Sequence, residues 1–163
     1  MHPETNGSVR VEPRWLDPAQ QRAWRAYMDG HQRLATELNR QLQRDSELSL
    51  AEYRILVLLS EAPERSLRMS ELADGVLSSR SRLTHQIRRL EADGLVSRST
   101  CLEDGRGVVA ELTDEGYRRL EAAAPGHVEA VRKGFIDLLT PAQLELVADI
   151  FTRIDTALTD PRP

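Results

Sequence analysis

The sequence contains very little cysteine, almost no lysine and no long apolar run. A single cysteine among 163 residues excludes an internal disulfide framework and any zinc site built on cysteine pairs. No apolar segment approaches the roughly 20 residues that a membrane-spanning helix needs. The first 14 residues also lack the apolar core of a signal peptide. We therefore expect a cytoplasmic protein with no membrane contact.

The overall charge is mildly negative, although the basic residues are almost all arginine. There are 22 basic and 26 acidic residues, which gives a formal net charge of −4, and Lys133 is the only lysine. That balance argues against a generic binder of polyanions but leaves local basic patches open. The length predicts one domain, or one domain with an extension, and the apolar content of 40% is typical of a soluble globular protein.

The spacing of apolar residues predicts a mainly α-helical protein with one small β-hairpin. Capping boxes at Ser49–Glu52 and Thr140–Gln143 mark two helix starts, and Gly94 supplies a left-handed exit from a third helix. Pro125 lies inside a predicted helix and is expected to kink or split it. The predicted elements are helices at about 18–45, 49–62, 70–77 and 79–93, strands at 95–101 and 107–112, and helices at 113–139 and 140–158.

Four segments follow from this order of elements. The compact middle could fold on its own, whereas the helices on either side carry apolar stripes that nothing in a monomer obviously covers. The predicted segments are a mobile arm (1–14), an N-terminal helix (15–48), a compact middle (49–113) and C-terminal helices (114–160).

The helix at 79–93 has one apolar and one polar side. At roughly 100° per residue, Leu83, Ile87 and Leu90 form a buried seam. Four arginines and no acid lie between residues 78 and 89. Arginine mixed with hydroxyl and imidazole groups can contact phosphates and also hydrogen-bond base edges in a major groove; the alternative is a solvated helix with unpaired arginines. The candidate DNA-binding residues are Ser79, Arg80, Ser81, Arg82, Thr84, His85 and Arg88.

The turn of the predicted hairpin supports the same interpretation. Asp104, Gly105 and Arg106 lie at its tip, and an arginine between two glycines can reach into a narrow minor groove. Alone, this feature is better explained as an exposed hairpin. Together, the helix pair and the hairpin match the plan of a winged helix–turn–helix.

Several short motifs resemble the signature of the MarR family of transcriptional regulators, and the likeness extends over about residues 17–158. They are Ser70-Glu-Leu-Ala73, Leu90-Glu-Ala-Asp-Gly-Leu-Val96 with Arg98, Asp104-Gly-Arg106, and Leu112-Thr-Asp-Glu-Gly116.

This resemblance implies a homodimer whose terminal helices interlock and whose two recognition helices read a pseudo-palindromic operator in double-stranded DNA. Segments 15–48 and 114–160 would then be the N- and C-terminal dimerisation helices, and segment 49–113 the winged helix–turn–helix DNA-binding domain. It also implies that helix 79–93 enters the major groove and that Arg106, braced by Asp104, enters the minor groove. The family usually carries Asp-Arg-Arg at the wing tip, so Gly105 is a departure that removes one arginine contact per wing.

The resemblance further implies a small aromatic or phenolic effector, bound between the dimerisation helices and the winged module. Aromatic and basic side chains on two neighbouring predicted helices are candidates to line that cleft, and the alternative is that they pack the core or the dimer interface. The candidates are Trp24, Tyr27, His31, Tyr53 and Arg54.

Other chemistry has little support in the sequence. The four histidines form no metal-binding pair, and no catalytic motif is present, so we expect no metal, no cofactor and no enzymatic activity. The predicted function is therefore that of a ligand-responsive repressor. Two alternatives remain: a winged-helix adaptor that binds protein instead of DNA, and a redox-responsive regulator that uses Cys101.

Overall fold

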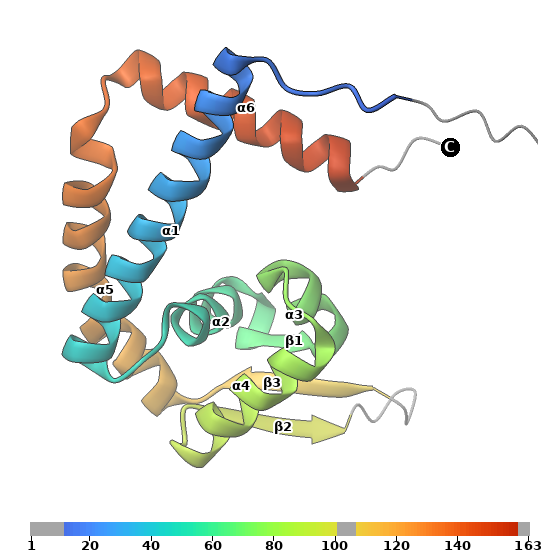
Figure 1. The fold of residues 1–163 in the computed structure, drawn as a ribbon. Helices are drawn as coiled ribbons and strands as arrows, with labels where there is room; N and C mark the ends of the chain where they lie inside the picture. The colour runs from blue at the N-terminus through green and yellow to red at the C-terminus, as the bar shows by residue number, and fades with distance from the viewer. Residues whose placement is uncertain (1–11, 101–106, 160–163) are drawn as a thin grey trace, which may run out of the picture. The chain divides into compact units, whose positions relative to one another are not determined.

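The computed structural model describes residues 12–100 and 107–159. Most of these residues are helical, and a small antiparallel sheet completes the fold (Figure 1), which confirms the expected fold class. The elements are α1 (Pro18–Ser46), α2 (Leu50–Glu61), η1 (Pro63–Arg65), β1 (Ser66–Arg68), α3 (Met69–Val76), α4 (Arg80–Ala92), β2 (Val96–Thr100), β3 (Val108–Leu112), α5 (Asp114–Gly134), η2 (Ile136–Leu138) and α6 (Pro141–Thr159).

The chain divides into two compact units, residues 1–33 and residues 34–163. The first unit holds the beginning of α1, where the side chain of Asp17 accepts hydrogen bonds from the backbone N–H groups of Ala19 and Gln20 at 2.8 and 2.9 Å. These bonds satisfy donors that a helix start leaves free. The second unit holds the end of α1 and every later element.

The sheet has three strands in the order β1–β3–β2. Strands β2 and β3 pair antiparallel from Val96↔Leu112 to Thr100↔Val108, as the predicted hairpin requires. Strand β1 was not predicted from the sequence, because three residues are too few to display an alternating pattern. It pairs with the other edge of β3 and so joins the loop after α2 to the hairpin.

The core of the second unit is built around α2. Ile55, Leu56 and Leu59 of this helix are fully buried. Helices α3, α4 and α5 and strand β3 all contact it. Leucines from α1, α3, α4 and the turn before β2 complete the cluster: Leu42, Leu72, Leu83, Leu90 and Leu95.

Several predicted helix boundaries are confirmed, and the end of α5 differs from the prediction. The capping box of Ser49 and Glu52 is present, and Gly94 has a φ of 70°. Helix α5, in contrast, continues through Pro125 and ends at Gly134, before the short η2. A proline removes one backbone hydrogen bond without forcing the helix to end, whereas Phe135 leaves helical geometry with φ −144° and ψ −61°.

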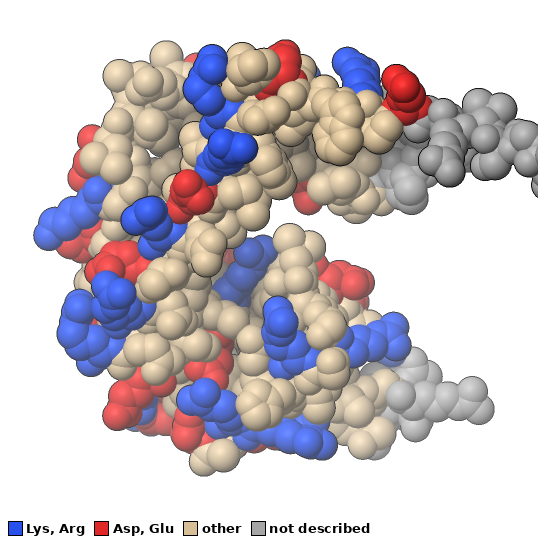
Figure 2. Space-filling model, in the orientation of Figure 1, with Lys and Arg blue, Asp and Glu red and all other residues tan. Residues whose placement is uncertain are grey.

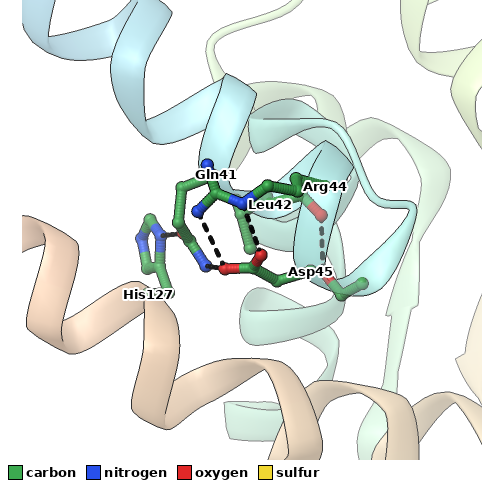
Figure 3. Close-up of polar contacts among 6 residues, drawn as sticks. Gln41, Leu42, Arg44, Asp45 and His127 are labelled. Atoms are coloured by element: carbon green, nitrogen blue, oxygen red, sulfur yellow. Dashed lines mark hydrogen bonds and ion pairs between the residues drawn. The ribbon is translucent and has the colours of Figure 1, made fainter.

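Helices α1 and α5 are joined by a small polar cluster (Figure 3). Gln41 is only 5% exposed, and its Nε2 donates a hydrogen bond to Asp45 Oδ2 at 3.0 Å. Its Oε1 lies 3.4 Å from Nδ1 of His127. The His127 ring packs against Tyr53 of α2, with ring centres 4.4 Å apart. Burial lowers the pKa of His127 and raises the pKa of Tyr53.

Candidate nucleic-acid interface

Helix α4 buries one side and exposes the other. Leu83, Ile87 and Leu90 are at most 1% exposed, which confirms the predicted seam. The exposed side carries cationic and polar groups on about three turns of helix: Arg80, Ser81, Arg82, His85 and Arg88. Helix α4 therefore presents a mixed basic and hydrogen-bonding surface to solvent.

A buried carboxylate pairs with the last turn of α4. Glu52 is 3% exposed, and its Oε2 accepts hydrogen bonds from the backbone N–H of Ser49 at 2.8 Å and from the Ser49 hydroxyl at 2.7 Å. Its Oε1 lies 3.3 Å from Nε of Arg89 on α4. Because this pair joins residues far apart in the sequence, no local pattern predicts it. A second ion pair ties Glu91 of α4 to Arg98 of β2 at 2.7 Å.

These ion pairs correct the charge count made for this helix from the sequence. Arg89 is neutralised by Glu52 and cannot be counted with the free positive charges. Within the described residues, Arg80, Arg82 and Arg88 form no ion pair. Figure 2 shows basic side chains gathered over α4 and the neighbouring hairpin. The local excess is therefore +3 instead of +4.

The hydroxyl groups near the start of α4 serve partly to build the helix. The Ser79 side chain accepts a hydrogen bond from the backbone N–H of Arg82 at 3.4 Å, so Ser79 is the N-cap of α4. The Thr84 hydroxyl donates to the carbonyl of Arg80 at 2.8 Å. His85 and Arg88 have no side-chain hydrogen bond to any described residue, so they are the groups best placed to contact another molecule.

The predicted tip of the wing lies outside the described residues. This applies to Asp104, Gly105 and Arg106, and also to Cys101. The two strands that lead to the tip are described, and they remain paired as far as Thr100 and Val108.

The five predicted cleft residues lie in different surroundings. Trp24, Tyr27 and His31 form a row of rings along α1 in the first unit, with successive ring centres 5.8 Å apart. Tyr53 is 9% exposed and packs against His127 in the second unit. Arg54 lines a pocket there, and it donates from Nη2 to the carbonyl of Gly75 at 3.1 Å.

That pocket has a volume of about 540 Å³ and lies among α1, α2 and the turn between α3 and α4. It contains two polar atoms that the sequence analysis did not single out. Ser78 Oγ and Gln86 Oε1 are buried and have no hydrogen-bond partner among the described residues. The lining residues are Ala35, Thr36, Asn39, Leu50, Ala51, Arg54, Val76, Leu77, Ser78, Arg82 and Gln86.

Comparisons with known proteins give the family. A family model described as the MarR family matches residues 48–108. The crystal structure of Sco3205, a MarR family transcriptional regulator from Streptomyces coelicolor in complex with DNA, is 45% identical. It superposes with a TM-score of 0.89 over 93% of this chain and 94% of that chain. This chain belongs to the MarR family of transcriptional regulators.

Other MarR-type proteins agree with this assignment. AbsC, a MarR family transcriptional regulator from Streptomyces coelicolor, is 40% identical and has a TM-score of 0.86 over 90% of this chain and 99% of that chain. The HTH-type transcriptional repressor YetL of Bacillus subtilis is 34% identical over 110 residues, which is 66% of either chain. The chain thus spans about two thirds of the curated relatives that it matches. The resemblance inferred from the sequence motifs is confirmed.

Two other kinds of feature were sought in this MarR family member. Within residues 12–100 and 107–159, no group of three or more histidine, cysteine, aspartate or glutamate side chains is arranged to hold a metal ion. Over the same residues, no helix has the length and apolar character needed to cross a membrane.

Proposed function

We propose that the chain is a transcriptional repressor that binds double-stranded DNA by inserting α4 into the major groove. The observation that carries this proposal is the exposed side of α4, where Arg82, His85 and Arg88 lie opposite the buried seam. Arginine can bind guanine bidentately or neutralise a phosphate, and histidine can hydrogen-bond a base edge. A helix that only gripped phosphates would need no histidine at its centre.

The proposed DNA-binding unit is a homodimer. Helix α6 supports this because apolar side chains one turn apart are exposed along it: Leu146, Ile150, Ile154 and Leu158, with exposed fractions of 57, 40, 47 and 78%. A second copy of the chain would cover such a stripe. Two-fold symmetry then requires two recognition helices about 34 Å apart, matching half-sites separated by roughly 10 base pairs.

The hairpin contributes the second DNA contact in this proposal. Arg106 is assigned to the minor groove, where a negative potential attracts arginine, and Asp104 is assigned to hold its guanidinium. Gly105 leaves each wing with one arginine fewer than the family pattern. The dimer therefore relies more heavily on α4 for its affinity.

The pocket of about 540 Å³ is the proposed effector site. Arg54 and Arg82 supply positive charge, and the unpartnered Ser78 Oγ and Gln86 Oε1 supply hydrogen-bonding groups. These groups suit a small aromatic acid or a phenol, whose ring would lie against the apolar part of the lining. Because Arg82 and Gln86 belong to α4, a bound effector would act directly on the helix that reads DNA.

The DNA-binding proposal is tested by removing two positive charges from α4 in one variant and two from α5 in a control variant. The wild-type chain is first used to select a duplex from a randomised pool, and affinity is then measured by band shift. We expect Arg82→Gln with Arg88→Gln to weaken binding at least a hundredfold. The matched control, Arg118→Gln with Lys133→Gln, removes the same charge from exposed positions on α5 that are 70 and 74% exposed, and we expect it to change affinity less than threefold. Equal losses in the two variants would refute the role of α4.

The effector proposal has its own test. A panel of aromatic carboxylates and phenols is screened for release of the selected duplex, and active compounds are retested on Gln86→Ala and Ser78→Ala. We expect these variants to bind the duplex and to need at least tenfold more compound for release. A compound that releases both variants and the wild type at one concentration acts outside this pocket.

A further inference from the structure

The winged module, from α2 to β3, is joined to the terminal helices by two short connections (Figure 1). The end of α1 meets α2 through residues 47–49, which we call the elbow, and β3 meets α5 through Thr113 alone. Both connections lie within the second unit. In a dimer held together by its terminal helices, these two connections set the direction in which each module carries α4.

The helical hydrogen-bond ladder is interrupted in the elbow. If α1 continued into α2, the backbone N–H of Leu50 would donate to the carbonyl of Ser46. Instead, this N–H donates to Asn39 Oδ1 at 2.9 Å, and the Ser46 carbonyl accepts from Arg119 Nη1 at 2.9 Å. Asn39 belongs to α1 and Arg119 to α5. Side chains from two helices therefore take up both halves of the missing backbone bond.

The backbone of the elbow has an uncommon conformation. Glu47 has a φ of 58°, in the left-handed region that residues other than glycine rarely adopt. Such a conformation persists only where the surrounding structure holds it. The next residue, Leu48, is 2% exposed and belongs to the core. The elbow is thus fixed by the burial of Leu48 on one side and by the Arg119 bond to Ser46 on the other.

Arg119 links the two connections to each other. It lies near the start of α5, close after Thr113, and its side chain is 34% exposed. Its second contact, with Glu47 Oε2 at 3.8 Å, involves a carboxylate that is 88% exposed, so that ion pair contributes little. The bond to the Ser46 carbonyl is the contact that matters. Any rotation of the end of α1 against α5 must break it.

We propose that Arg119 and Asn39 are positioning residues for DNA binding, which lock the elbow and so narrow the range of half-site spacings that the dimer accepts. This inference rests on the proposed function and deepens it. Glu52 transmits the constraint to the recognition helix, because it binds the backbone N–H of Ser49 in the elbow at 2.8 Å and lies 3.3 Å from Arg89 of α4. A loosened elbow would let each module tilt toward a misplaced half-site.

The test varies the spacer between the two half-sites of the selected duplex by one or two base pairs. Each base pair moves a half-site by about 3.4 Å and turns it by roughly 35°. We expect a change of one base pair to weaken wild-type binding about tenfold or more, because the DNA must then bend or twist to compensate. In Arg119→Gln this penalty should shrink to about threefold, because the modules then absorb part of the change.

A matched control removes the same charge without touching the elbow. Arg118 is the neighbouring residue on α5, is 70% exposed and pairs with Glu115 of its own helix. Arg118→Gln should keep the wild-type spacer penalty. The penalty is a ratio of two affinities, so a smaller folded or dimeric fraction lowers both affinities alike and leaves the ratio unchanged. It therefore distinguishes positioning from general damage to the fold.

Two further variants sharpen the test. Asn39→Ala changes an exposed side chain on α1 and removes the other half of the junction, so it should also reduce the penalty. It decides the matter alone if Arg119→Gln does not fold. Arg119→Lys keeps a cationic donor for the single bond that Nη1 makes, and it should keep the penalty near that of the wild type.

The outcomes separate this inference from the proposed function. If Arg119→Gln folds and keeps the wild-type penalty, the locked elbow is refuted while DNA binding stands. The inference is also wrong if Arg118→Gln or Arg119→Lys is as permissive as Arg119→Gln, or if the wild type binds every spacer equally well. If no duplex is selected at all, the proposed function fails and the inference fails with it.

Discussion

Replacing Gly116 with alanine should damage the junction between the winged module and α5. A Cβ atom added at Gly116 would overlap the carbonyl oxygen of Leu95 and lie 2.7 Å from Leu112 Cδ1 and 2.9 Å from the Leu95 carbonyl carbon. Real Cβ atoms essentially never approach other atoms so closely, and the nearest obstacle is backbone. The first turn of α5 must therefore move away from the turn that precedes β2.

The magnitude follows from the contacts that this movement breaks. The Thr113 hydroxyl accepts from the backbone N–H of Gly116 at 2.9 Å and donates to the carbonyl of Gly94 at 2.8 Å, and the backbone N–H of Thr113 donates to Leu95 at 3.1 Å. Loss of a helix cap costs about 1 kcal/mol, each hydrogen bond about 1 kcal/mol, and overpacking about 1–3 kcal/mol. Taking the cap, the two further hydrogen bonds and the overpacking together, we expect Gly116→Ala to lower the free energy of unfolding by about 4–6 kcal/mol.

Gly30 provides the matched control. A Cβ added at Gly30 meets nothing within 4 Å, and alanine is a better helix former than glycine by about 1 kcal/mol. Gly30→Ala should therefore be neutral or stabilising. Urea unfolding followed by circular dichroism at one fixed protein concentration measures both variants. A loss below about 1 kcal/mol for Gly116→Ala would show that the junction can relax and that this reasoning is wrong.

Three further predictions concern single side chains. Glu52→Gln removes the buried charge that pairs with the half-exposed Arg89. In urea unfolding it should lower the free energy of unfolding by on the order of 1–2 kcal/mol, and it should also weaken DNA binding. Unchanged stability would mean that the pair contributes nothing. Burial lowers the pKa of His127 below its ordinary value of 6.5, so the unfolded chain takes up this proton first and stability should fall as pH drops below about 6.5. Urea midpoints at about pH 7.5 and 5.5 should differ more for the wild type than for His127→Gln, and an equal difference would exclude His127 as the cause. Arg88→Ala should relax base preference in band shifts, whereas Arg106→Ala should weaken binding evenly across sequences; an unchanged affinity for Arg106→Ala would remove the wing from the interface.

Much of the fold could be predicted because its helix boundaries are encoded locally. The Ser49 and Glu52 capping box, the Ser79 cap and the left-handed Gly94 each depend on residues within a few positions of one another. The buried seam of α4 follows from helical periodicity alone. Strand β1 was missed because it is defined by its pairing with β3, more than 40 positions away.

Only the part of the candidate site that lies on a single helix could be predicted from the sequence. The exposed side of α4 could be read from one helix, but the neutralisation of Arg89 by Glu52 depends on how α2 packs against α4. The pocket of about 540 Å³ is likewise assembled from separate elements. The sequence did not connect Ser78 or Gln86 with a cleft, because a serine or a glutamine carries no such signal until packing gives it neighbours.

Titration of the full-length chain with its selected palindromic duplex and with a scrambled duplex, across about 50–200 mM salt, tests most directly whether α4 reads DNA. We expect affinity for both duplexes to fall steeply and linearly on a log–log plot. We also expect the selected duplex to be preferred by about a thousandfold or more, and Arg82→Gln with Arg88→Gln to reduce both the slope and the preference. Equal affinity for the two duplexes, or affinity that does not change with salt, would contradict the assignment of α4 as a recognition helix.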